Sequence, residues 1–248
     1  MKQRMASEPV TNKLLCSLPA ASLAMLMPHL DPVELPAGMV IDHVDGPIEK
    51  LFFVNRGLVS LVKVMQDGRT VEVGAVGIEG VTDPNALFGI DRAVIETMVQ
   101  VPGTAFSIDR TILKHSLEHD PVVARAMQQY ARYAYGKLAQ TAACNRLHTL
   151  EERCCRWVLT CHDSALCDTL PLTHEFLGMM LGAPRSSVSL VAKVLQRAGC
   201  IDYSRGMMRV VNRASLADAA CECYFSGIAA MKQFLGSIST GAEPHLPA

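Results

Sequence analysis

The chain has 248 residues, half of them apolar, and 23 Lys and Arg residues against 24 Asp and Glu give a formal net charge of −1. This composition excludes a disordered chain and is long enough for a sizeable core and two domains. The nine cysteines are odd in number and scattered along a long chain, which favours reduced thiols in the cytoplasm over a disulfide framework.

The N-terminal segment superficially resembles a secretory signal, because Lys2 and Arg4 precede the apolar stretch "KLLCSLPAASLAMLM". Pro19 interrupts this stretch early, and its leucines recur at steps of three and four, which predicts two short amphipathic helices. Cys16 follows Leu15, where a lipoprotein site would need a small residue. No stretch reaches the roughly 18 apolar residues that span a bilayer, so we expect no membrane contact.

From Leu35 to about Ile108 the apolar residues form short β-branched runs such as "MVIDHV" and "RTVEVGAV", separated by glycines. Such runs predict several antiparallel strands in a roll of the jelly-roll kind. Asp67 and Gly68 lie between two of these runs and predict a hairpin in which both residues take a positive φ.

A long helix is predicted to begin after Asp120, which can cap it, with Pro121 in the first turn. One apolar stripe runs along this helix and is interpreted as a dimer seam, with a helix lying on the roll as the alternative. The stripe consists of Val123, Met127, Tyr130, Ala134 and Leu138. Thr149 and Glu152 have the spacing of a capping box, so a second helix begins near 150 after a hinge at 145–148.

A pair of helices joined by a tight turn is predicted around "LGAPRSSVSL" (181–190). Thr173 caps the first helix, Gly182 ends it, and the second runs from Arg185 to Gly199. Two strand-like runs joined at Arg205 and Gly206 then predict a β-hairpin wing. Short polar side chains beside an arginine suit the major groove of DNA. The expected DNA-binding residues are Thr173, Arg185, Ser186, Ser187, Ser189, Lys193 and Arg205.

Charge supports this interpretation, although the whole chain is slightly acidic. Residues 173–213 hold six Lys or Arg and two acidic residues, a local charge of +4, which is what phosphate contacts require. A helix pair of this kind also occurs in proteins that bind no DNA, so a regulatory module that binds a ligand or senses thiol redox state and acts through protein contacts remains the alternative. The sequence carries no nucleophile elbow, phosphate loop or metalloprotease motif, so we expect no enzyme.

The chain resembles the Crp/Fnr family of transcription regulators over nearly its whole length. The resemblance rests on "FFVNRGLVSLV" and "DGRTVEVGAVGIEG" in the strand-rich part and on "LPLTHEFLGMMLGAPRSSVSLVAKVLQRAGCIDYSRG" in the helical part. It implies an α+β chain with an effector-sensing β-roll at 1–118, a dimerisation helix and hinge at 119–147, a winged helix-turn-helix domain at 148–235 and a tail at 236–248. It further implies a homodimer on a near-palindromic site in double-stranded DNA. Arg185 matches the arginine that opens the family's recognition helix, whereas Ser186 stands where many members carry a glutamate.

The sensor is where the sequence departs from the family pattern. Members that bind cyclic nucleotides hold the phosphate with a Gly-Glu pair and an arginine followed by a hydroxyl residue. Here Glu79 and Arg92 are the candidate effector-pocket residues, but Ala93 replaces the hydroxyl residue and the spacing is longer. We therefore expect a small-molecule effector of unknown identity and no response to cyclic AMP.

The cysteines and histidines show no spacing in the sequence that is typical of metal ligands. Only Cys16 lies in the N-terminal segment, where some members of the family hold an iron–sulfur cluster that needs about four thiolates. Cys221 and Cys223 would point some 200° apart on a helix, and the eight histidines are dispersed. We therefore expect no metal site and mostly buried cysteines that act as small hydrophobic residues, and any cofactor stays unknown.

Overall fold

The structure of the chain, a computed structural model, describes residues 8–240. Lys2, Arg4 and the end of the expected tail, from 241 to 248, lie outside these residues. Among the described residues, no helix combines the length and the apolar character needed to cross a membrane.

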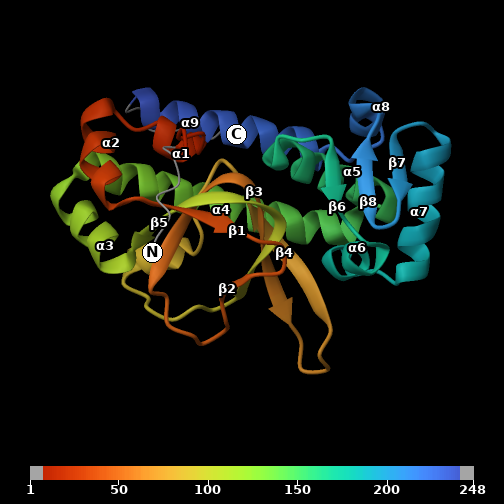
Figure 1. Cartoon of the computed structure of the whole chain (residues 1–248), viewed down its shortest axis with the longest axis horizontal. Coiled ribbons are helices and arrows are strands. Elements are labelled where there is room, and N and C mark those ends of the chain that lie inside the picture. Colours follow the sequence, from red (N-terminus) through yellow and green to blue (C-terminus); the bar gives the residue numbers. More distant parts are fainter. Residues whose placement is uncertain (1–7, 241–248) are drawn as a thin grey trace.

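The N-terminal part is the expected antiparallel roll, which confirms the α+β class. Its strands are β1 (Asp31–Leu35), β2 (Val40–Asp42), β3 (Lys50–Val64), β4 (Thr70–Val76) and β5 (Glu96–Asp109). The sheet order is β1-β5-β3-β4, β2 also pairs with β5, and every pairing is antiparallel. The two short helices that close one end of the roll, α1 (Lys13–Cys16) and α2 (Ala20–Leu26), also match the expectation (Figure 1). Two 3-10 turns, η1 (Met27–His29) and η2 (Pro84–Phe88), complete this part.

The hairpin between β3 and β4 forms where it was predicted, but its turn differs from the prediction. Only Gly68 takes a positive φ, of 81°, and Asp67 does not. The Gly68 N–H donates to Met65 O at 3.0 Å, and the Met65 N–H donates to Arg69 O at 2.8 Å. The loop is therefore three residues long, with the glycine at the left-handed position that such loops favour, instead of the expected two-residue turn.

Two helices follow the roll, α3 (Arg110–His119) and the long α4 (Pro121–Leu147). Asp120 caps α4 as predicted, since its carboxylate accepts hydrogen bonds from the N–H groups of Val122 and Val123. The capping box of Thr149 and Glu152 also forms and starts α5 (Leu150–Ala165). The break between α4 and α5 is shorter than expected, because α4 remains helical to Leu147.

The predicted dimer seam on α4 is wrong, because its residues pack on the chain's own roll. Val123, Met127 and Tyr130 are only 1–2% exposed within the single chain. The Tyr130 hydroxyl donates to Val81 O at 2.8 Å, and Ala134 packs against the same core. Leu138 lies against Gly74 of β4. This packing is the alternative that the sequence left open, a helix lying on the roll. Val123, Met127 and Tyr130 are too deeply buried to contact a second chain, whereas Ala134 and Leu138 are partly buried.

The C-terminal part is a winged helix-turn-helix domain built on α5. It contains β6 (Thr169–Pro171), α6 (His174–Leu181), α7 (Arg185–Arg197), β7 (Ile201–Ser204), β8 (Met207–Val210) and α8 (Arg213–Asp218). Strand β6, which the sequence did not predict, extends the wing to a three-stranded sheet in the order β6-β8-β7. Leu177 and Met180 of α6 and Val188 and Leu195 of α7 are buried in one core with α5.

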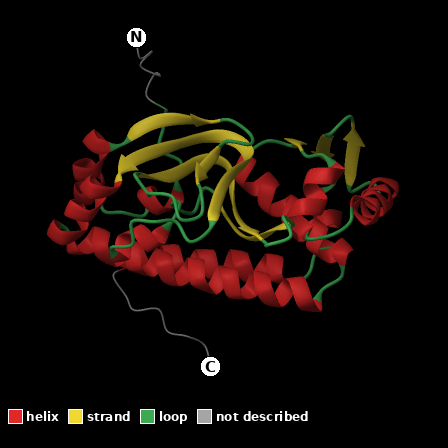
Figure 2. Cartoon of the chain, turned by 90° about the horizontal axis from the view of Figure 1, so that it is seen from below, coloured by secondary structure: helices red, strands yellow, loops and turns green. Residues whose placement is uncertain are grey.

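The last helix, α9 (Cys223–Thr240), leaves this domain and lies along α4 (Figure 1). Its Phe234 and Ile238 join the core of the roll beside Tyr130, and Phe234 stacks on Tyr133 with ring centroids 5.0 Å apart. The domain expected at 148–235 thus holds most of a helix that contacts the roll, and the tail expected from 236 begins inside that helix. In Figure 2 the helices run as a layer beneath the strands of the roll and continue toward the small sheet of the wing.

Candidate nucleic-acid interface

The turn between α6 and α7 forms because three residues each meet a local requirement. Thr173 Oγ1 accepts a hydrogen bond from the Phe176 N–H at 3.2 Å and caps α6. Gly182 ends α6 at a φ of +60°, a conformation that other residues rarely adopt. Pro184 then occupies the N-cap position of α7 with a φ of −58°. The interruption in "LGAPRSSVSL" is therefore the turn of a helix-turn-helix.

Helix α7 presents its polar side to solvent, as the sequence predicted. Val188, Ala192 and Leu195 are 0–2% exposed on the inner side. Arg185, Ser186 and Lys193 are exposed, whereas Ser187 is partly buried. The face opposite the buried residues consists of Ser186, Leu190, Lys193 and Arg197, which recur at steps of four, three and four.

Leu190 is the residue on this face that the sequence reasoning missed. It is 65% exposed, and Val194 beside it is 48% exposed. The signal was present in the sequence, because Leu190 lies four residues after Ser186 and three before Lys193. If α7 entered a major groove, a leucine exposed at this position would suit contact with a thymine methyl group.

Ser189 has a different environment from the one expected. Its hydroxyl lies 2.9 Å from His174 Nδ1 and donates to Arg185 O at 2.9 Å. The His174 ring stacks on Tyr203 of the wing with centroids 4.1 Å apart. Burial, Arg185 and Lys193 together lower the pKa of His174, so the ring is neutral at pH 7. Ser189 and His174 thus connect α6, α7 and the wing, and they hold α7 in its orientation.

The wing ends in a two-residue turn at Arg205 and Gly206, whose φ values are 51° and 78°. Both positive values identify the turn type that matches the twist of a hairpin. Arg205 is exposed at this tip, whereas Arg209 lies 3.6 Å from Asp202. Arg213 pairs with Asp163 at 2.7 Å and donates to the Tyr224 hydroxyl. In the described part of the chain, the exposed cations of α7 and the wing tip that have no acidic partner are Arg185, Lys193, Arg197 and Arg205.

The candidate effector residues Glu79 and Arg92 do not form one site. Glu79 is buried and accepts a hydrogen bond from Lys137 Nζ of α4 at 2.6 Å. Burial alone would raise the pKa of Glu79, but the Lys137 ammonium outweighs burial and holds it below its usual range. Arg92 is exposed and does not line the cavity that contains Glu79.

That cavity has a volume of about 850 Å³ and lies between the roll, α4, α5 and α9. Glu79 and Lys137 line one side of it, and Arg156, Asp163 and Arg213 line the other. A cavity of this size can hold a small molecule. Its walls come from the roll and from the helix-turn-helix domain, so a molecule that filled it would contact both.

Most cysteines are buried, as expected for small hydrophobic residues. Cys154, Cys155, Cys161 and Cys200 lie in the core around α5. Burial raises the pKa of Cys154 to about 12, so this thiol is protonated at pH 7. The sequence analysis placed Cys221 and Cys223 on one helix. This is wrong, because Cys221 precedes α9 and is not helical. The two side chains therefore do not diverge, and they gather with Cys144 and His148.

Comparison with known proteins agrees with this architecture. Residues 152–219 match the model of the Crp-like helix-turn-helix domain. The transcriptional regulator SdrP of Thermus thermophilus is 27% identical over 194 residues, which cover 76% of this chain and 93% of SdrP.

Two solved structures show the same fold. FixK2 from Bradyrhizobium japonicum has a TM-score of 0.63 at 18% identity and covers 77% of this chain and 98% of its own. CLP from Xanthomonas campestris, a regulator that responds to c-di-GMP, has a TM-score of 0.62 at 16% identity and covers 78% of this chain and 100% of its own.

The roll followed by a helix-turn-helix is the fold of these regulators. Residues 152–219 form a Crp-like helix-turn-helix domain, and the resemblance to the Crp/Fnr family seen in the sequence is thereby confirmed.

Proposed function

We propose that the chain acts in the cytoplasm as a homodimer that binds a near-palindromic operator in double-stranded DNA under the control of a small molecule. The observation that carries this proposal is the outer face of α7. Lys193 is exposed on this face, and Arg185 is exposed in the first turn of the same helix. Among the described residues neither has an acidic partner, and Arg205 is exposed at the tip of the adjacent wing. Arg185 bonds a guanine, and Lys193 and Arg205 contact phosphates.

The second element of the proposal is the dimer, which forms through the exposed side of α4 instead of the buried stripe. Gln128, Tyr135, Ala139 and Ala142 are exposed and recur at helical spacing on one side of α4. Tyr135 is 76% exposed, and the alanines allow a second helix to approach closely. Two recognition helices related by such an axis enter successive major grooves about 34 Å apart.

The third element is the control by a small molecule, for which the cavity at the domain junction is the supporting observation. A ligand there contacts α4, α5 and α9 together, and so its binding energy depends on how these helices are arranged. The Glu79 and Lys137 pair offers one acceptor and one donor in its wall.

DNA binding by variants tests the proposal. The duplex is the strongest site recovered by selection from a random library, and a scrambled duplex is the reference. We expect Arg185→Ala to weaken the selected site by about 1–3 kcal/mol and the scrambled duplex much less. Arg205→Asn, which keeps the left-handed turn, should weaken both alike and reduce the salt slope by about one unit.

Lys50→Ala is the control, because Lys50 is exposed at the start of β3 in the roll. It should leave both affinities unchanged. If Arg185→Ala weakened both duplexes equally, α7 would not read sequence. If selection recovered no site and footprinting showed no two-fold protection, the helix pair would serve protein contacts instead.

A further inference from the structure

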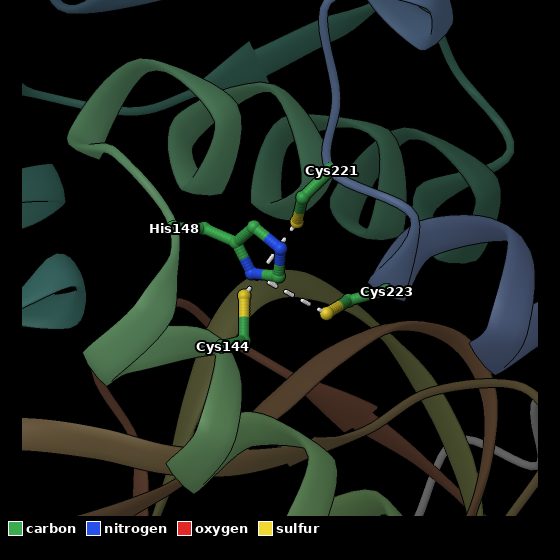
Figure 3. Close-up of side chains that lie close together, drawn as sticks. All are labelled: Cys144, His148, Cys221 and Cys223. Carbon is green, nitrogen blue, oxygen red and sulfur yellow. Dashed lines mark hydrogen bonds between the residues drawn. The ribbon is translucent and has the colours of Figure 1, made fainter.

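Four potential metal ligands from two segments that are far apart in the sequence meet at the junction between the two domains. Cys144 lies in the last turn of α4, and His148 is the residue that follows this helix. Cys221 precedes α9, and Cys223 is its first residue. Figure 3 shows the four side chains pointing toward a common centre, and their ligand atoms all lie within 4.8 Å of one another.

The distances within this cluster fit one tetrahedral ion. Cys144 Sγ lies 3.6 Å from Cys221 Sγ, and Cys223 Sγ lies 3.7 Å from His148 Nδ1. Zinc–sulfur bonds of about 2.3 Å in a tetrahedron place two sulfurs about 3.8 Å apart. Three cysteines and one histidine are also a ligand set that structural zinc sites use. A cluster of several irons needs thiolates spread around its outside, and this set is too compact for one.

We propose that Cys144, His148, Cys221 and Cys223 bind one zinc ion. All four coordination positions are then filled by protein, which is the arrangement of a structural site and leaves no position for a substrate. Each cysteine releases its proton to solvent when the ion binds, because the thiolate is the ligand.

The surroundings of the ligands support the proposal independently. His148 Nε2 lies 2.9 Å from a carboxylate oxygen of Glu222, which leaves Nδ1 to face the ion. Metal-bound histidines commonly donate their second ring nitrogen to a carboxylate in this way. Gln140 Nε2 donates a hydrogen bond to Cys223 Sγ at 2.9 Å. This hydrogen bond favours the charged thiolate of Cys223.

The position of the site gives the ion a structural role in coupling the domains. It joins the end of α4, the hinge at His148 and the origin of α9. The far end of α9 places Phe234 and Ile238 in the core of the roll. An ion that holds Cys221 and Cys223 against α4 therefore fixes where α9 begins and how the hinge is oriented.

Metal analysis of the full-length protein purified under reducing conditions tests the proposal. We expect about one zinc per chain, or uptake of one equivalent when zinc is added to the apo protein. Replacement by Co²⁺ should give strong ligand-field bands and thiolate charge transfer, which identify a tetrahedral site with sulfur ligands. The double variant Cys221→Ser/Cys223→Ser should lose both signals. The variants Cys16→Ser and Cys167→Ser, at exposed cysteines outside the cluster, should keep them.

Two further variants separate ligation from folding. His148→Cys should still bind Co²⁺, with stronger charge transfer because a fourth thiolate replaces the imidazole. Glu222→Gln should keep the cobalt spectrum but weaken zinc affinity by about 10–100-fold, since it alters only the partner of His148.

Three results would overturn the proposal. The first is a reduced, folded chain that takes up neither zinc nor cobalt. The second is metal retained at full stoichiometry by the double serine variant. The third is iron with acid-labile sulfide bound by these residues. A disulfide between Cys144 and Cys221, together with no metal uptake after its reduction, would assign the pair to redox chemistry instead.

Discussion

Single residues determine how this chain tolerates charge in its interior. Glu79 is buried, and its carboxylate depends on the ammonium group of Lys137. Lys137 Nζ also donates to Ala75 O at 2.9 Å, so it connects α4 both to β4 and to the loop that follows β4. Because Lys137 lowers the pKa of Glu79, the pair stabilises the fold above the usual carboxyl pKa and loses that contribution as the pH falls.

Replacing Lys137 with methionine should therefore destabilise the protein at pH 7. The uncompensated charge on Glu79 is expected to reduce the free energy of unfolding by about 3–5 kcal/mol. The loss should be smaller at pH 5, because Glu79 without Lys137 takes up a proton more readily. Urea denaturation at both pH values measures the effect.

Two variants complete that measurement. Lys137→Met/Glu79→Gln should recover much of the stability, and Lys232→Met, at an exposed lysine of α9, should change it little. An equal loss at both pH values would mean that packing, and not the charge on Glu79, is what Lys137 supplies.

Leu190 carries a prediction about base reading. If its exposed side chain contacts a thymine methyl, replacing thymine with deoxyuridine in each half-site should weaken binding by the wild-type protein. Leu190→Ala should be insensitive to this replacement, because the methyl contact is already lost. Titration of the four protein and DNA combinations gives the coupling between side chain and methyl group. If the effects of the two changes were additive, Leu190 would not contact the thymine methyl group.

At the scale of elements, α4 has three sides with different partners. One side packs on the roll through Val123, Met127 and Tyr130, and a second packs on α9. The approach to the roll is close, because Gly80 has no side chain and the Tyr130 ring occupies the space that a Cβ atom would take. Among the described residues, nothing covers the third side, around Tyr135, so this is the part of α4 that we assign to a second chain.

Tyr135→Asp should therefore convert a dimer into a folded monomer. A charge at this 76% exposed position perturbs the single chain little but would be buried without a partner in the dimer. Sedimentation velocity gives the mass, and circular dichroism checks the fold. Val122→Asp, at an exposed position in the first turn of α4, should leave the mass unchanged. Met127→Asp should instead unfold the chain, and a folded monomer from that variant would contradict the assignment of the two sides.

At the scale of the whole molecule, the helix-turn-helix domain shares an apolar core with the roll, to which Leu58, Val62 and Val101 contribute. Trp157 Nε1 of α5 donates to Glu72 of β4 at 3.0 Å, and Glu72 also accepts from the Ser60 hydroxyl. Val71 of β4 lies against Gly182 at the turn of the helix-turn-helix. Helix α9 adds a further contact, since it starts beside the helix-turn-helix domain and ends in the core of the roll (Figure 1).

Phe234→Ala should loosen this arrangement. Phe234 is 5% exposed and stacks on Tyr133, so truncation is expected to cost about 3–5 kcal/mol locally. Hydrogen exchange of the α9 amides should accelerate while α7 stays protected. Phe225→Ala, at a 52% exposed phenylalanine of the same helix, is the matched control and should leave exchange unchanged. Uniform acceleration across the chain would indicate one cooperative unit without a separable α9.

The sequence by itself determined the elements whose signals are local. Asp120, the Thr149 and Glu152 pair, Thr173 and Gly182 act through backbone groups within a few residues, so their structural roles could be predicted. The same holds for the wing turn at Arg205 and Gly206 and for the outward polar side of α7. From these elements and the resemblance, the regulator class followed without coordinates.

Only the tertiary structure decided which apolar face of α4 meets which partner. The pattern of Val123, Met127 and Tyr130 marks a buried stripe, but an apolar stripe is the same whether its own roll or a second chain covers it. The metal ligands were hidden for a related reason. Cys144 and Cys221 are 77 positions apart, and their 3.6 Å separation depends on α9 folding back onto α4, a long-range contact that no local spacing encodes.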